Sequence, residues 1–386
     1  MCCKNYSVAS SDQQKRQTLA IHINSMDAGK RKGWKKWLIP LVIVAVIKTL
    51  SLFPAVVETW YSTALYKWLS IILRTLTGFI PFSIGDILYI LAGAWLLVKL
   101  IRAIIVLFKK KVSWQSFFKG LKKTILVLIW VYIIFNIFWG LNYDRLGIAY
   151  QLQLSPEAYT AEELKSLTTE LQEKLNDTRK ILGDGEVKYN EPAEVFRQVK
   201  EAYNEAEKKY SFLDYKVSAI KKSIFGAAGN YMGYLGYYNP FTGEAQVNAT
   251  IPSFLIPYTS CDEAAHQLGY GTEDEANFVA FLTAKSSGEK TFQYSMYFDL
   301  FNYANGELFI RDSLAARANY KLLDTLVRKD IQEYRTFLMA YKNPLEPLIN
   351  ILYGEYLKAN NQPMGLDTYD EVVAWLIAYR KKYGEL

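Results

Sequence analysis

The stretch that decides the fold is Ser260-Cys-Asp-Glu-Ala-Ala-His-Gln-Leu-Gly-Tyr-Gly-Thr-Glu-Asp-Glu-Ala-Asn277. Asp262 and His266 lie four positions apart, so on a helix their side chains share one face, and Glu263 lies one position further round. The motif His-Glu-x-x-His has this geometry: two side chains bind Zn²⁺, and the glutamate takes a proton from the metal-bound water. Here an aspartate stands where the first histidine would be. The sequence therefore predicts a metal-binding helix with one altered ligand.

A third ligand is expected shortly after this helix. Gly269 is a natural stop for a helix, and the chain then returns to a helical pattern in which Glu273 or Glu275 can turn back toward the metal. Either carboxylate would complete a three-ligand site with one open position, which hydrolytic zinc chemistry requires.

The composition divides the chain into two parts. Of the 386 residues 51% are hydrophobic and only 22% are charged, and almost all long apolar runs precede residue 142. The net charge of +7 is also uneven: residues 1–36 and 109–123 carry +6 each, so the other segments sum to −5. Basic residues that flank apolar runs indicate membrane topology, and we therefore expect no nucleic-acid partner.

Three apolar segments are long enough to cross a bilayer, near residues 37–57, 84–108 and 124–141. The segment near residues 60–80 is also apolar but carries Lys67 and Arg74. If it spanned the membrane, the lysine cluster that follows the second span would lie outside, against the positive-inside rule. We therefore expect it to lie in the membrane interface, on the outer face.

This pattern predicts a multi-pass protein of the cytoplasmic (inner) membrane, in contact with the lipid bilayer. Residues 1–36 form a basic cytoplasmic tail, residues 37–143 form the membrane region, and residues 144–386 form an exported domain. The N-terminus lies inside and the C-terminal domain outside. The initiator is Met1 or Met26, because residues 1–25 show no periodicity.

The exported domain is expected to be mostly helical with some strand. Gly, Tyr and Asn enrich residues 226–248, which favours turns and strands. The strand Glu244–Ala249 either lies beside the cleft and pairs with extended substrate or is a plain sheet strand. Pro344 and Pro347 break the helical pattern. Helices are predicted over residues 161–182, with a capping box at Thr160, and over 193–209, 293–303, 312–341 and 369–383.

Longer strings carry a resemblance to a known family. Pro257-Tyr-Thr-Ser-Cys-Asp-Glu-Ala-Ala-His-Gln-Leu-Gly-Tyr270 with the following Glu-x-Glu-Ala-Asn-Phe278, and the upstream Gly236-Tyr-Tyr-Asn-Pro-Phe-Thr-Gly-Glu-Ala-Gln-Val-Asn248, resemble the family catalogued as domain of unknown function 3810. The resemblance implies a membrane-anchored zinc peptidase: an α-helical anchor of three transmembrane helices, then a mostly α, α+β zincin-like domain. That family has histidine where this chain has Asp262.

The resemblance also implies roles for single residues. It makes His266 a ligand, Glu263 the general base and a downstream glutamate the third ligand. In gluzincins of the thermolysin type the third ligand opens a Glu-x-x-Ala/Ser-Asp/Asn string, which favours Glu273 over Glu275. Asn277, one turn on, would orient a ligand or cap the site. Two tyrosines are candidate donors to a developing oxyanion, with plain packing as the alternative: Tyr294 and Tyr297.

Two functions follow. The first is a membrane-anchored zinc-dependent metallopeptidase that acts on peptides or proteins outside the cytoplasmic membrane, with Glu263 as base. The second is a catalytically inactive zincin-like relative that binds peptides or a partner in the envelope. Asp262 leaves both open: its side chain is shorter than that of histidine, and two carboxylate ligands neutralise Zn²⁺ and make its bound water less acidic. The sequence thus predicts weakened zinc binding or a preference for a harder metal.

Overall fold

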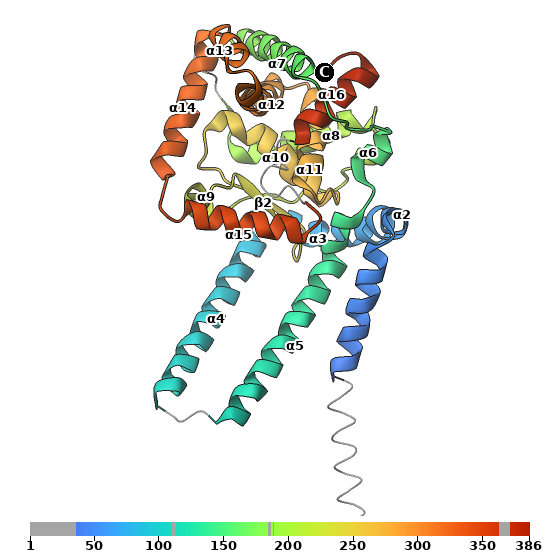
Figure 1. Ribbon diagram of the computed structural model, residues 1–386, viewed down its shortest axis with the longest axis vertical. Coiled ribbons are helices and arrows are strands. Elements are labelled where there is room, and N and C mark those ends of the chain that lie inside the picture. The colour runs from blue at the N-terminus through green and yellow to red at the C-terminus, as the bar shows by residue number, and fades with distance from the viewer. Residues whose placement is uncertain (1–35, 110–112, 184–186, 188, 363–370) are drawn as a thin grey trace, which may run out of the picture.

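The computed structural model describes residues 36–109, 113–183, 187, 189–362 and 371–386. It is mostly helical, with one small sheet, and a helical domain stands at one end of three long apolar helices (Figure 1). Almost all of the predicted cytoplasmic tail lies outside the described residues.

Two helices are long and apolar enough to cross a membrane, α4 (Ile84–Lys109) and α5 (Trp114–Phe138). The first matches the predicted span near residues 84–108. The second begins ten residues before the predicted 124, because Ser113 caps it by accepting a hydrogen bond from the Ser116 amide. Both helices expose nearly all of their apolar surface, which supports membrane association.

The predicted span near residues 37–57 is not one continuous helix in the structure. The helix Lys36–Ser51 ends before Pro54, and the chain changes direction by 98° into the helical segment Pro54–Gly78. Proline favours the first turn of a new helix rather than the interior of an existing one, which explains the break. The new segment consists of α2 (Pro54–Val56), the π-helix η1 (Val57–Leu65) and α3 (Tyr66–Gly78). The bent pair supplies a third span at most.

The three apolar helices all have one end at the domain and the other end away from it. The start of the helix Lys36–Ser51, the end of α4 and the start of α5 lie at one end of the molecule, and the domain lies at the other (Figure 1). The described lysines of the second basic segment belong to this end: Lys109 ends α4, and Lys119, Lys122 and Lys123 lie in the first part of α5. This arrangement fits the predicted topology, and the assignment of that end to the cytoplasm stays a prediction.

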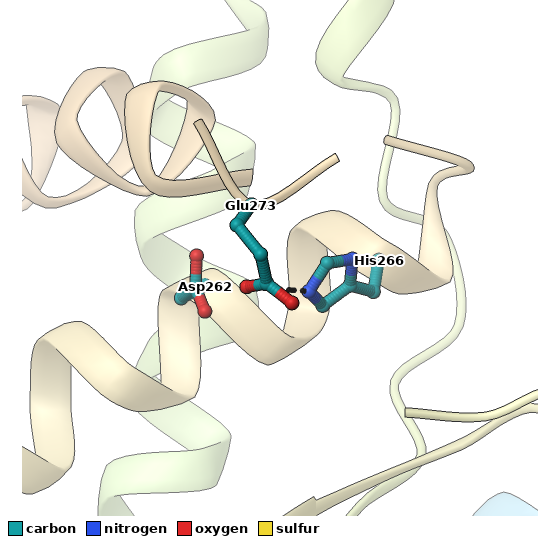
Figure 2. Close-up of side chains that lie close together, drawn as sticks. All are labelled: Asp262, His266 and Glu273. Atoms are coloured by element: carbon teal, nitrogen blue, oxygen red, sulfur yellow. Dashed lines mark ion pairs between the residues drawn. The ribbon is translucent and has the colours of Figure 1, made fainter. Parts of the chain in front are cut away.

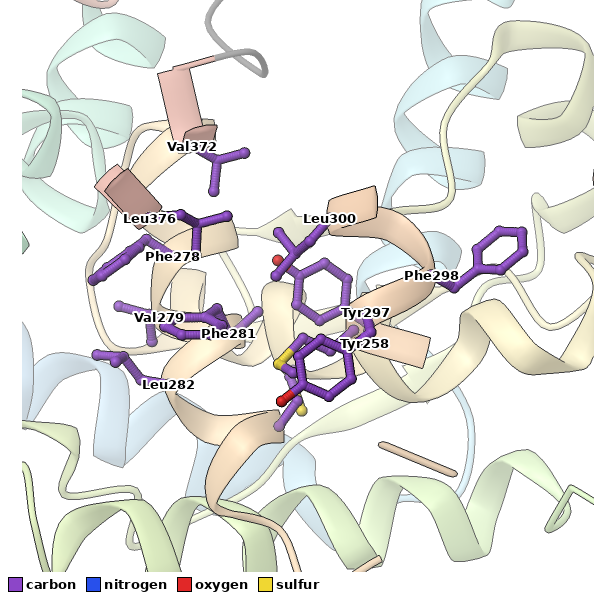
Figure 3. Packing of buried hydrophobic residues seen from close by; sticks show 14 of the residues in the cluster. Tyr258, Phe278, Val279, Phe281, Leu282, Tyr297, Phe298, Leu300, Val372 and Leu376 are labelled. Atoms are coloured by element: carbon purple, nitrogen blue, oxygen red, sulfur yellow. The ribbon is translucent and has the colours of Figure 1, made fainter. Parts of the chain in front are cut away.

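Three helices pack against the central pair of the domain, α10 (Ile256–Gln267) and α11 (Glu273–Ser286). They are α8 (Pro192–Glu207), α12 (Lys290–Arg311) and α16 (Glu371–Tyr383), and a further helix, α7 (Ala161–Ile181), packs on the outside of α12. The predicted capping box at Thr160 is present, and the leucines of α7 are fully buried. Figure 3 shows the core around α11, where large apolar side chains from α10, α11, α12 and α16 pack together and are buried from water. Burial of this apolar surface stabilises the domain.

The sheet has the strand order β1-β3-β2 and lies beside α10. Its strands are β1 (Ile220–Lys222), β2 (Gly236–Asn239) and β3 (Glu244–Val247); β3 pairs in parallel with β1 and antiparallel with β2. The predicted strand therefore has both edges occupied and cannot add an extended substrate, so the plain-strand alternative holds. Glu244 of β3 also accepts hydrogen bonds from the amides of Ile84 and Gly85, which ties the sheet to the start of α4.

Other elements correct the sequence-based boundaries. Residues expected as turn and strand include the helix α9 (Gly226–Met232), and the predicted helix 312–341 is two helices, α13 (Ser313–Lys321) and α14 (Thr325–Tyr341). The prolines expected to break the helical pattern do so, because α14 ends before Pro344 and a new helix, α15 (Glu346–Ala359), begins with Pro347 in its first turn. Shorter elements complete the chain: η2 (Gly140–Asp144), α6 (Gly147–Leu152), η3 (Ser211–Leu213) and η4 (Ser253–Leu255).

Candidate metal centre

The site is built on α10, which is almost completely buried. Pro257 stands in its first turn, and Gly269 follows its end with a φ of +90°, a left-handed conformation that glycine adopts without strain. The turn after Gly269 brings α11 back alongside α10. The end of one helix and the start of the next therefore face each other.

Three side chains meet across this turn (Figure 2). Asp262, His266 and Glu273 each offer a ligand atom, and these atoms lie within 4.8 Å of one another. Nε2 of His266 is 3.9 Å from a carboxylate oxygen of Glu273. A tetrahedral zinc with bonds of about 2.0–2.1 Å needs ligand atoms about 3.4 Å apart, so a modest contraction of this cluster is required to hold the ion.

The tautomer of His266 fits a ligand. Its Nδ1 lies 2.7 Å from the carbonyl oxygen of Tyr270, which can only accept a hydrogen bond. Nδ1 therefore carries the proton, and Nε2 presents its lone pair toward the cluster. Metal-binding histidines are commonly fixed in this way by a carbonyl or carboxylate behind the ring.

The acidic groups of the cluster lack compensation. Among the described residues, Oδ1 of Asp262 and Oε2 of Glu263 are buried without a hydrogen-bond partner. Burial raises the pKa of Asp262 well above its usual range, and the charges of Glu273 and Asp299 raise it further. Burial likewise raises the pKa of Glu263, with further increases from Asp262 and Glu273. A cation between these groups would offset both effects, so the donor set fits a divalent metal.

Glu263 lies against the edge strand β2. A Cβ placed on Gly236 would lie 2.4 Å from Oε1 of Glu263, so a larger residue here would force this carboxylate to move. The side chain is 5% exposed. Strand β2 therefore forms one wall next to the predicted general base.

The two candidate third ligands have different surroundings. Glu273 belongs to the cluster, and its Oε1 accepts a hydrogen bond of 2.9 Å from the hydroxyl of Tyr353 on α15. Glu275 instead accepts a bond from the amide of Ile148 and packs against the backbone at the start of α6. Asn277 donates to the backbone carbonyl of Glu273 and so fixes the first turn of α11 rather than the carboxylate itself.

The proposed oxyanion donors do not join the cluster in the described contacts. The hydroxyl of Tyr294 donates to Asp330 on α14, and Tyr297 packs in the core. Sequence reasoning missed Tyr303 on α12, whose pKa is raised well above 10 by burial, by Asp299 and by the cluster carboxylates Asp262 and Glu273. Its spacing of four residues from Asp299 places both on one face of α12, a signal that the sequence contains.

Helix α3, which follows the bend after the first apolar helix, is hydrogen-bonded to the end of α10. Tyr66 and Ser70 of α3 donate to the last carbonyls of α10, Tyr66 to His266 at 3.3 Å and Ser70 to Gln267 at 2.7 Å. These bonds satisfy carbonyls that a helix end leaves without an internal partner. Sequence reasoning missed these contacts because 200 positions separate Tyr66 from His266.

One comparison with known proteins gives a match. Residues 61–377 match the family described as "Protein of unknown function (DUF3810)", and the chain belongs to this family. The match covers α3, both candidate spans and the cluster of Asp262, His266 and Glu273. No curated protein and no solved structure matches the chain.

Proposed function

We propose that this chain is a membrane-anchored, zinc-dependent peptidase of the zincin type, which acts on peptides or proteins outside the cytoplasmic membrane. The observation that carries the proposal is the convergence of three ligand atoms within 4.8 Å, next to a buried glutamate on the same helix. A zinc ion held by Asp262, His266 and Glu273 would supply a Lewis acid and a water of lowered pKa.

The residues of the chain then have distinct tasks. Glu263 takes a proton from the attacking water, and burial, followed by the charges of Asp262 and Glu273, raises its pKa and so makes its carboxylate a stronger base. Tyr270 holds the imidazole of His266 in the tautomer that leaves Nε2 free. Strand β2 provides a wall beside Glu263 along which a substrate backbone can lie.

A second function is supported by Asp262 itself. Because a carboxylate replaces an imidazole, the cluster holds two acidic ligands and one histidine, a set that binds zinc less well and favours harder ions. Without a metal of sufficient Lewis acidity, the same domain would bind peptide or an envelope partner without hydrolysis.

One experiment separates the two functions. The full chain, purified in detergent, is assayed for bound metal and for cleavage of a peptide library, together with Glu263→Gln. Retained metal and loss of cleavage in the variant support the peptidase. A native chain that binds peptide but holds no metal and cleaves nothing overturns it and supports the binding protein.

A further inference from the structure

Helix α15 exposes its apolar side. Leu345, just before the helix, and Leu348, Ile351 and Leu352 within it are 54–63% exposed. Gly354 and Leu357 face the domain instead and are buried. Surface helices of water-soluble domains bury their apolar stripe and expose polar residues, so α15 shows the opposite arrangement.

Helix α3 has the same inverted character. Its exposed residues include Trp68, Ile72 and Leu76, at 66%, 55% and 60%. The face turned to the domain is polar: Tyr66, Ser70, Arg74 and Thr77 are buried there. A helix that buries polar groups in protein and presents tryptophan and leucine outward is suited to the interface of a bilayer.

The position of α15 connects it to the candidate spans. It runs along the base of the domain, level with the ends of α4 and α5 that adjoin the domain (Figure 1). The hydroxyl of Tyr356 on α15 lies 3.1 Å from that of Tyr143, in the turn that follows α5. Its apolar stripe thus continues the exposed apolar surface of the spans.

We propose that α15 is an interfacial helix that inserts its apolar stripe into the same lipid surface as α3, and so seats the domain on the bilayer at a second point. The bilayer is the occupant because the stripe adjoins the spans and lies level with their ends. The one acid within the stripe, Glu355, pairs with Lys358 at 3.0 Å, so its charge is compensated at the headgroup level. This membrane contact of α15 does not depend on whether the protein hydrolyses peptides.

Insertion of α15 into the lipid surface also fixes the distance between the cluster and the membrane. Tyr353 projects from α15 to the carboxylate of Glu273, so the helix in the lipid surface contacts a candidate ligand directly. If the proposed peptidase function holds, on which this step alone rests, the substrates are polypeptide segments that lie close to the bilayer surface.

The test measures lipid contact directly. The full chain with Cys2→Ser and Cys3→Ser keeps Cys261, which is buried, and single cysteines at Leu348 or Leu352 are labelled with bimane. Each protein is reconstituted in nanodiscs, and quenching is compared between brominated phospholipid and aqueous iodide. Asn350→Cys, exposed on the opposite side of α15, is the matched control. Leu96→Cys in α4 and Leu314→Cys in α13, at the far end of the domain, are the references for lipid and for water (Figure 1).

We expect brominated lipid to quench both α15 labels to within about twofold of Leu96→Cys, with iodide reaching Asn350→Cys and Leu314→Cys more strongly. Iodide quenching of Leu348→Cys and Leu352→Cys at the level of Leu314→Cys would place the stripe in water and overturn the proposal. Quenching by neither agent would mean that another protein or a second copy covers the stripe, which also overturns it. None of these readings depends on metal or on peptide cleavage.

Discussion

The imidazole ring of His266 lies against the indole ring of Trp139, with ring centroids 6.0 Å apart and planes crossing at 78°. Trp139 is the residue that follows and caps the end of α5, a candidate span. A candidate metal ligand therefore contacts the end of a candidate membrane helix, and Tyr66 of α3 donates to the backbone of the same histidine. The candidate metal ligands and the candidate membrane helices pack against each other, so changes on either side are expected to affect the other.

Gly236→Ala tests the contact between strand β2 and Glu263, the proposed general base. The added Cβ would come within 2.4 Å of Oε1 of Glu263, so the carboxylate must move. Because a displacement of about 1 Å at a reacting group can cost on the order of 10²-fold in rate, we expect peptide cleavage to fall by about that factor with metal content unchanged. Gly288→Ala is the control, since nothing lies within 4 Å of its added Cβ. Equal activities of the two variants would contradict the assignment of Glu263.

Asp262→His tests the altered ligand. Imidazole suits zinc better than carboxylate does, and the exchange removes one of the buried negative charges that raise the pKa of Glu263. Because changes in outer partners of a ligand already shift metal affinity about 10–100-fold, we expect at least about tenfold tighter zinc binding. Competition with a chromophoric chelator measures this. Weaker zinc binding in the variant would show that Asp262 is the better ligand in this site.

Tyr353→Phe tests the link between α15 and the cluster. The variant loses the hydrogen bond to Oε1 of Glu273 and little volume. We expect zinc affinity to fall about 10–100-fold, because such partners orient their ligand. Tyr356→Phe on the same helix removes only the contact with Tyr143 among the hydroxyl bonds described and is expected to leave affinity unchanged. If both variants bind zinc as the native chain does, Tyr353 does not orient Glu273.

Local patterns in the sequence predicted the helices well, and distant contacts explain what was missed. The capping box of α7 and the four-residue spacing of Asp262 and His266 are local signals, and the structure contains both the cap and the shared face. The bend before α2 and the start of α15 involve prolines, whose presence marks a boundary without saying which kind. The partners of the cluster, Tyr66 and Tyr353, lie 200 and 80 positions from the residues they contact, beyond any periodicity.

Glu275→Gln tests a buried carboxyl that lies outside the cluster. Burial, and then the charge of Asp274, raises the pKa of Glu275 from 4.5 to about 7, although Arg145 and the amide of Ile148 oppose the shift. The folded state therefore binds this proton more tightly than the unfolded state does. The resulting stabilisation is complete below pH 4.5 and is lost as the pH rises through about 7, a loss of about 3 kcal/mol.

Glutamine keeps a carbonyl that accepts from Ile148 and cannot ionise, so the native chain should lose free energy of unfolding between pH 5 and pH 8 relative to E275Q. Denaturant unfolding in detergent at both pH values measures the difference, with Glu157→Gln as an exposed control. A native chain whose stability relative to E275Q stays unchanged over this range would mean that Glu275 is held ionised by Arg145.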